Sequence, residues 1–348
     1  MAYTTINKSS SFMNTKLYTG NGTTNHAITG VGFQPDWNWT KARTDTDAHT
    51  LTDAVRGAPN YIMSSSSDGN NTNAEFLKSF DSDGFTVGNN ARLNYNNYTY
   101  ASWNWKAGTA VSGNTGGSGS YKTYSGSVNT TAGFSIIKYT GNGSAGHTIP
   151  HHLGAVPKMI IFKQLTGSNV DWRVYHEALG NTHRLCLNDT SASTNDDSAF
   201  NDTSPTSSVF TVGGSSSTNP NNYDMIAYCF AEIQGYSKFG SYTGNGNANG
   251  PFAYTGFKPA FTLFKKASSG TGEWFLLDGI RDLFDPVKKV FEANTTSAES
   301  TDPDLDYLSN GFKIRTTNGN LNSNGVTYIY MAFGQSLVGT NNIPNNAR

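Results

Sequence analysis

The chain has 348 residues and a formal net charge of −1, with 24 lysine and arginine residues against 25 aspartate and glutamate residues. This balance excludes the broad basic surface typical of nucleic-acid-binding proteins, so we expect no nucleic-acid partner. Only 14% of the residues are charged, against about 25% in ordinary globular proteins, while 13% are aromatic and 37 are glycine. Such a composition favours many short strands joined by polar turns and argues against disorder.

The N-terminal stretch MAYTTINKSSSFMNTKLYTG has no apolar segment of the secretory type, and no run of 18 apolar residues follows. We therefore expect no signal peptide and no membrane insertion, for a protein made in a reducing cytoplasm. Cys186 and Cys229 are the two cysteines. Two buried thiols are the favoured interpretation, and a disulfide between them stays open.

The pentapeptide YTGNG occurs three times, at Tyr18–Gly22, Tyr139–Gly143 and Tyr242–Gly246. A proline follows 15 or 16 residues after the first glycine of each copy, and a lysine follows six residues after that proline. These residues are Pro35 and Lys41, Pro157 and Lys163, and Pro259 and Lys265. Further along the chain, each copy of the pentapeptide is followed by a phenylalanine-containing segment and then an aromatic run. The spacing of these features predicts three tandem units of about 100 residues.

The unit boundaries are predicted at residues 1–107, 133–236 and 237–348. The segment 108–132 is rich in glycine and serine, which predicts a flexible linker between the first two units. The connection Ile233–Ser241 is short, so we expect the second and third units to pack as a rigid pair.

Within each unit, short runs rich in β-branched and aromatic residues are bounded by glycine, asparagine or proline, as in GFSIIKYTG and KMIIFK. This pattern predicts an all-β fold of three tandem β-sandwich units of the jelly-roll type. The apolar residues between Ile280 and Phe291 follow helical spacing, but Pro286 interrupts them. We expect a turn followed by a strand there, with a short helix as the alternative.

The YTGNG stretch has two interpretations. Gly141–Gly146 matches the phosphate-binding pattern G-x-G-x-x-G, but HTIPHHLG follows it and contains no helix. Asn-Gly is instead favoured in type I′ hairpin turns. We therefore expect structural turn glycines, with positive φ at the second glycine of each copy. These glycines are Gly20, Gly22, Gly141, Gly143, Gly244 and Gly246.

Two stretches resemble metal sites only in part. His147, His151 and His152 lack a cysteine or carboxylate at ligand spacing, so surface imidazoles in a turn are expected. The segment DPDLD (residues 302–306) alternates acids as in a calcium loop, but it lacks the required glycine and the final glutamate. We predict no metal and no cofactor, while a Ca²⁺ site in an Asp/Asn-rich loop stays open.

No nucleophile motif is present, and the acidic residues at matched places, Asp53 and Asp278, are replaced by His176 in the second unit. A catalytic group is seldom triplicated with a changed residue, so we predict no catalytic residues and a protein that is not an enzyme. Tryptophans can stack on sugar rings, although core packing is the commoner role. The candidates for ligand or partner contact are Trp37, Trp39, Trp103 and Trp105.

The stretches MAYTTINKSSSFMNTKLYTGNG, SFDSDGFTVG, YCFAEIQGYSKFGSYTGNG and GPFAYTGFKPAFTLFK extend the pattern over nearly the whole chain. With them the sequence resembles repeat-built virion proteins of marine bacteriophages of the cyanophage and pelagiphage type, described as structural or tail-fibre-like. The resemblance implies concanavalin-like β-sandwich units and a place on the virion surface. It implies no catalytic residues.

We therefore expect a virion surface protein, in the first place a tail fibre or adsorption protein that binds a host-surface glycan or protein. A capsid decoration or head-fibre protein is the alternative, and a polysaccharide depolymerase or free lectin is the third. The expected partners are other virion proteins and further copies of the chain, in a homo-oligomer such as the trimer of a fibre.

Overall fold

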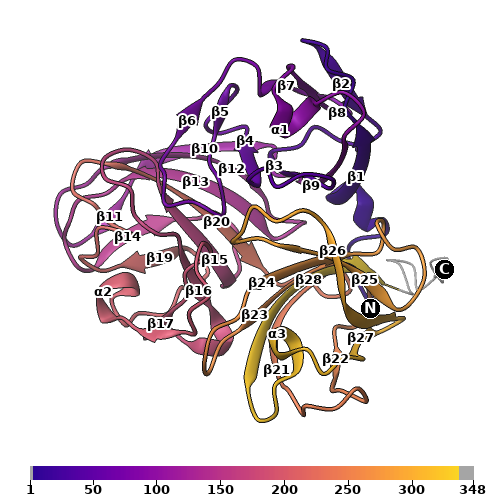
Figure 1. The fold of residues 1–348 in the computed structure, drawn as a ribbon. Helices are drawn as coiled ribbons and strands as arrows, with labels where there is room; N and C mark the ends of the chain where they lie inside the picture. The colour runs from indigo at the N-terminus through magenta and orange to yellow at the C-terminus, as the bar shows by residue number, and fades with distance from the viewer. Residues whose placement is uncertain (1–2, 337–348) are drawn as a thin grey trace.

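The computed structural model describes residues 3–336, and its fold is all-β, as predicted from the sequence. Figure 1 shows three groups of strands around a common centre, coloured from indigo through magenta to yellow. We call residues 3–107 unit 1, residues 108–236 unit 2 and residues 237–336 unit 3.

Each unit contributes one inner sheet with the same antiparallel strand order. In unit 1 the order is β1 (Met13–Thr19), β9 (Thr99–Trp105), β3 (Trp37–Ala42) and β4 (Thr50–Asp53). In unit 2 it is β13 (Phe134–Thr140), β20 (Asp224–Ala231), β15 (Pro157–Gln164) and β16 (Arg173–His176). In unit 3 it is β21 (Ser237–Thr243), β28 (Thr327–Gln335), β23 (Lys258–Lys266) and β24 (Trp274–Asp278). The aromatic run that closes each unit is thus a central strand. That the units are copies of one sequence repeat stays a prediction, which this shared order supports.

An outer layer of short strands covers each inner sheet. It comprises β2 (His26–Thr29), β8 (Gly84–Val87) and β7 (Leu77–Asp81) in unit 1, and β11 (Gly116–Gly117), β14 (His147–Pro150) and β19 (Val209–Val212) in unit 2. In unit 3 it comprises β22 (Phe252–Tyr254), β27 (Gly311–Ile314) and β26 (Ser300–Leu308). There β25 (Val287–Glu292) joins β24 to β26, so eight strands form one curled sheet close to a barrel. Phe85, Phe210 and Phe312 are buried between the layers.

The remaining elements are short. They are β5 (Asn60–Tyr61), β6 (Asn71–Thr72), β17 (His183–Arg184), β18 (Thr194–Asn195), α1 (Ala91–Asn94), α2 (Asp197–Phe200), α3 (Gly319–Asn322) and the 3-10 turns η1 (Ser9–Ser11) and η2 (Glu177–Leu179). The stretch after Ile280 forms a turn followed by β25, as predicted, and not the alternative helix. Within residues 3–336, no helix has the length and apolar character needed to cross a bilayer.

The predicted flexible linker at 108–132 is wrong, because this segment folds as part of unit 2. Its strands β10 (Thr109–Asn114) and β12 (Thr123–Asn129) extend the inner sheet in the order β10-β12-β13. Tyr124 and Val128 on β12 are buried in the core of unit 2, which fixes the hairpin to the sheet. Its glycines and serines lie largely on the exposed side, where a strand needs no large side chain.

The three inner sheets face one another across a single central core. Aromatic rings from all units meet there: Trp37 stacks on Tyr228 with 4.5 Å between ring centroids, and Trp105 lies 5.9 Å from Phe333. Phe230 contacts Phe333 at 6.1 Å. Units 2 and 3 are therefore not a separate rigid pair, since unit 1 shares the same core with both.

Candidate functional site

The four tryptophans proposed as ligand contacts do not reach the surface. Trp37, Trp39 and Trp103 have an exposed fraction of 0%, and Trp105 has 1%. They alternate on β3 and β9 so that all four side chains point to the face that packs on the other units. The prediction of a ligand role is wrong for all of them, because this sheet face is buried against its neighbours instead of facing solvent.

The YTGNG corners carry the predicted positive φ, which is 68° at Gly22, 72° at Gly143 and 66° at Gly246. The predicted hairpin is wrong, however, because β1 pairs with β9 whereas the following strand β2 pairs with β8. Each corner instead carries the chain from the inner to the outer sheet. The asparagine before the second glycine has no positive φ, so the turn is not of type I′.

The first glycine of each corner is needed for a different reason. A Cβ at Gly20 would lie 2.2 Å from the carbonyl oxygen of Tyr95, and the corresponding distances are 2.1 Å at Gly141 and 2.4 Å at Gly244. Another backbone passes directly against these glycines, so no side chain fits. Both glycines of the motif thus serve the backbone.

A fully buried asparagine holds each corner: Asn94, Asn219 and Asn322. The side-chain oxygen of Asn219 accepts a hydrogen bond from the amide of Asn142 at 2.8 Å. Its side-chain nitrogen donates to the carbonyls of Ser144 and Gly213, each at 2.9 Å. Equivalent bonds occur at the other two corners. Sequence reasoning missed these residues, although each stands six residues before a matched position of the closing strand, which an alignment of the three units would have shown.

The matched acids Asp53 and Asp278 each form a buried ion pair with an arginine at a junction between units. Asp53 pairs with Arg56 at 2.5 Å and also accepts a hydrogen bond from the hydroxyl of Tyr228 in unit 2 at 2.7 Å. Burial and the charge of Asp53 raise the pKa of Tyr228 well above its usual value. Asp278 likewise pairs with Arg281 at 2.5 Å and accepts from the indole of Trp103 in unit 1 at 3.0 Å.

His176 replaces the acid at the third junction for a visible reason. Met331 of unit 3 occupies the strand position that Trp103 holds in unit 1 and Tyr228 holds in unit 2. Its side chain has no N–H or O–H to donate. His176 donates instead from Nε2 to the carbonyl of Tyr330 at 3.2 Å. Burial lowers its pKa to about 4, so the ring is neutral at pH 7. Histidine stands at this junction in place of an acid because the neighbouring unit offers a carbonyl acceptor there and no side-chain donor.

The matched lysines are also buried between units. Each Nζ donates to two backbone carbonyls: Lys41 to Ala42 and Asp45, Lys163 to Ser67 and Val170, and Lys265 to Thr190 and Gly272. Burial lowers the pKa of each lysine to about 8. Two of these carbonyls, at Ser67 and Thr190, belong to the preceding unit, so Lys163 and Lys265 tie neighbouring units together. Both carbonyls bonded by Lys41 belong to its own unit.

The aromatic ring that follows each matched lysine in the sequence also donates a hydrogen bond to a backbone carbonyl. Trp172 donates to the carbonyl of Met63, Trp274 to that of Cys186, and His49 to that of Glu292, so each ring N–H crosses to another unit. Since the carbonyl needs a donor, His49 carries its proton on Nε2, and its Nδ1 accepts from the indole of Trp39 at 2.8 Å.

The expected surface imidazoles are only partly correct. His147 and His151 are fully buried, and His147 is bonded to Asn219 and Thr115, whereas His152 contacts the hydroxyl of Tyr124. Asp304 pairs with Lys288 and Asp306 with Arg315. Within residues 3–336, no group of three histidine, cysteine, aspartate or glutamate residues is placed to hold a metal ion.

Both cysteines are free and buried, as favoured from the sequence. Cys229 lies inside the sandwich of unit 2, where burial raises its pKa, and Cys186 lies beside Arg173 and Arg184. They form no disulfide with each other.

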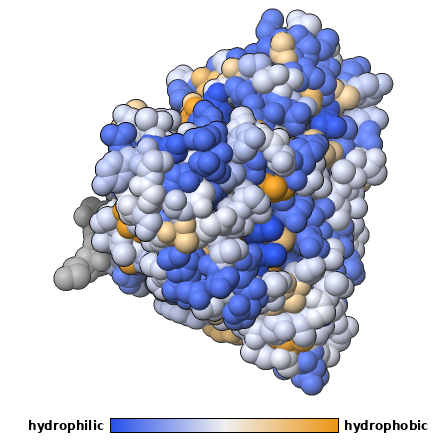
Figure 2. Space-filling model, turned by 90° about the vertical axis from the view of Figure 1, so that its left-hand side faces the viewer, coloured by the Kyte–Doolittle hydropathy of each residue, from blue (hydrophilic) through white to orange (hydrophobic). Residues whose placement is uncertain are grey.

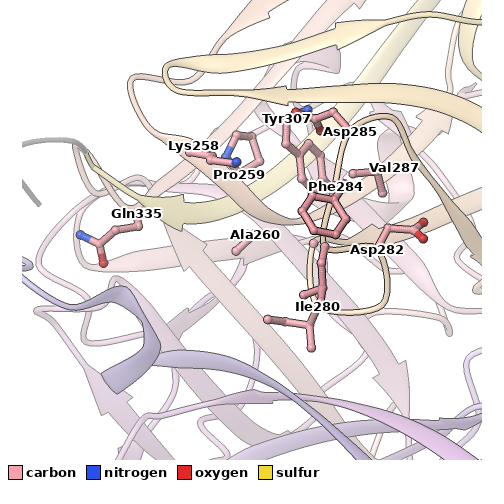
Figure 3. Close-up of a pocket in the computed structure, with 12 residues that line it drawn as sticks. Lys258, Pro259, Ala260, Ile280, Asp282, Phe284, Asp285, Val287, Tyr307 and Gln335 are labelled. Atoms are coloured by element: carbon pink, nitrogen blue, oxygen red, sulfur yellow. The ribbon is translucent and has the colours of Figure 1, made fainter. Parts of the chain in front are cut away.

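The surface is mostly hydrophilic on the face shown in Figure 2, where apolar residues form only small spots. A larger apolar feature is the loop Gly279–Pro286 of unit 3. Leu283 and Phe284 are 73% and 84% exposed, and Ile280 is 42% exposed. The loop borders a pocket of about 210 Å³ (Figure 3). The pocket is lined by six residues of this loop and six others: Gly279, Ile280, Asp282, Leu283, Phe284 and Asp285 of the loop, with Lys258, Pro259, Ala260, Val287, Tyr307 and Gln335.

This loop is the surface feature best suited to contact another molecule. Figure 3 shows Phe284 and Tyr307 among the side chains that line the pocket, while the carboxylate of Asp282 points away from them. In units 1 and 2 the corresponding loops carry Val55 and Leu179, which pack against the central core. In unit 3 the apolar side chains remain outside.

No curated protein and no solved structure matches this chain significantly. A family model matches residues 8–336, which include the three inner sheets, all three corners and the exposed loop. The protein therefore belongs to the family described as "Domain of unknown function (DUF7483)".

Proposed function

We propose that this protein is a bacteriophage virion surface protein, in the first place a tail fibre or adsorption protein that binds the host surface. The observation that carries the proposal is the exposed apolar loop Gly279–Pro286 on an otherwise closely packed body. Large exposed apolar side chains beside a pocket are typical of contact sites. The matched acids Asp53 and Asp278 are held in ion pairs away from solvent, so these two carboxylates are not open to a substrate.

A second observation fits both this role and the alternative of a capsid decoration protein. The three inner sheets surround one core, and each junction repeats the same kind of bond, so a single chain presents three similar sides. A body of this shape suits a threefold position of a capsid lattice as well as a fibre axis. The position of the protein on the particle, at the tail or on the head, distinguishes the adsorption role from the decoration role.

The first experiment locates the protein on purified phage particles with gold-labelled antibodies raised against the full chain. Label at the tail tip supports the adsorption role, and label on heads, including tailless heads, supports decoration. Intact particles without label, from a phage whose genome encodes the chain, would overturn both.

The second experiment measures binding of the purified full chain to host cells by sedimentation with the cells. We expect the variant L283S/F284S to lose at least tenfold in affinity. The matched control is Tyr121→Ser, which removes a side chain that is 71% exposed in unit 2. Equal loss in both variants, or no loss in either, would exclude the loop as the contact site.

A further inference from the structure

The strand β10 is an open sheet edge with no protective residues. It is the end strand of the six-stranded sheet β10-β12-β13-β20-β15-β16, and Figure 1 shows it beside β12. Five of its six residues are exposed, and its sequence TAVSGN contains neither a charge nor a proline. Exposed edges normally carry such residues because they prevent pairing with another chain. Among the other end strands, β1, β7 and β21 each carry a lysine, whereas the shorter β2, β19 and β22 carry neither lysine nor proline.

The outward hydrogen-bonding groups of β10 follow from its register. Thr115 donates to the carbonyl of Lys122 at 2.7 Å, directly beyond the pair Asn114↔Thr123. Bonded and non-bonded pairs alternate along an antiparallel ladder, so the odd residues of β10 face β12. The N–H and C=O groups of Ala110, Ser112 and Asn114 therefore point away from the sheet. Within residues 3–336 these main-chain groups have no hydrogen-bond partner.

The same chain already uses this mode of pairing. Strand β13 holds the position that β1 and β21 hold in the other inner sheets, and β12 adds to its edge over six residue pairs. Within residues 3–336, only the inner sheet of unit 2 is extended in this way, and β10 is left as the new edge. A groove of small side chains lies beside it, with Ala54, Val55, Ser125 and Ser127 among its lining residues and a volume of about 430 Å³.

We propose that β10 pairs with β10 of a second copy of this chain. Antiparallel pairing about a twofold axis at Ser112 places Ser112 opposite its own copy and Ala110 opposite Asn114, which gives three pairs of outward residues and joins two six-stranded sheets. The edge is self-complementary because each outward residue offers one donor and one acceptor. With no charged residue on the strand, two copies meet without repulsion between side-chain charges.

This inference does not depend on a virion role. The test is sedimentation equilibrium of the full chain, where we expect a concentration-dependent dimer of twice the 37.5 kDa chain mass. Ser112→Pro removes an outward N–H without touching the bonds to β12, since proline is tolerated at such edge positions. It should weaken dimerisation at least tenfold. The matched control Ser241→Pro makes the same change on the edge strand β21, where it should leave the dimer intact.

A second variant guards against a folding defect. Ser112→Lys keeps the backbone donor but brings two positive charges together at the twofold axis, and it should also yield monomer with an unchanged thermal unfolding curve. In the wild-type dimer, the amides of Ala110, Ser112 and Asn114 should exchange with solvent more slowly than at monomer concentrations. A wild-type chain that stays monomeric, or a dimer that dissociates with Ser241→Pro but not with either change at Ser112, would overturn the proposal.

Discussion

Single side chains decide the corners of this molecule, and asparagine is as important there as glycine. The glycines allow the backbone to turn and to approach its neighbour, but they provide no bond that fixes the turn. Asn219 supplies that bond, because its one amide group connects three separate segments of the chain. A shorter or apolar residue at this place leaves buried N–H and C=O groups without partners.

We expect Asn219→Ala to lower the free energy of unfolding by about 2–4 kcal/mol, because several buried polar groups lose their partner and each costs about 1–3 kcal/mol. Urea unfolding followed by fluorescence measures this change. The control is Asn221→Ala, an exposed residue two positions on, for which a change below about 0.5 kcal/mol is expected. Similar losses in both variants would contradict the role of the buried amide.

At the scale of elements, the segment Lys106–Gly133 shows how composition alone misleads. Its glycines and serines are typical of a flexible linker, yet β12 alternates so that Tyr124 and Val128 meet the core of unit 2. A few apolar side chains at the spacing of a strand outweigh the flexibility of the residues between them, because the neighbouring edge of β13 supplies hydrogen bonds along the whole length.

We expect β10 and β12 to resist proteolysis while the protein is folded. A broad-specificity protease should leave Thr109–Asn114 and Thr123–Asn129 uncut under native conditions and should cut both in urea, as mass spectrometry of the fragments will show. A flexible linker would instead be cut first and would release unit 1. Early cleavage within these strands would therefore contradict the observed sheet.

At the scale of the whole molecule, the three units are held together by buried groups whose charge state matters. His49 and His176 each donate a hydrogen bond to a carbonyl of unit 3. Burial lowers the pKa of His49 well below its usual value and that of His176 to about 4, and it also lowers the pKa of His151 to about 4. These rings are neutral in the folded protein at neutral pH.

We expect the free energy of unfolding to fall as the pH drops from about 6.5 to 4. In that range the unfolded chain binds protons at these histidines and the folded chain does not, so acid favours unfolding. Each unit of difference in pKa contributes about 1.4 kcal/mol, which gives a combined loss of several kcal/mol. Thermal unfolding across this pH range measures it. His176→Gln, which cannot titrate, should show a flatter profile, and parallel profiles of variant and wild type would contradict this origin.

The sequence by itself determined the all-β fold, the threefold recurrence of the pentapeptide and the positive φ of Gly22, Gly143 and Gly246. These features depend on local patterns: alternating apolar residues, turn residues and spacing along the chain. The placement of the tryptophans, the strands in Lys106–Gly133 and the hydrogen bonds of the asparagines behind each corner were decided by the tertiary structure. A strand has two faces, and the sequence does not say which one meets another unit, so Trp37 and Trp103 are core residues only because three sheets close around one centre.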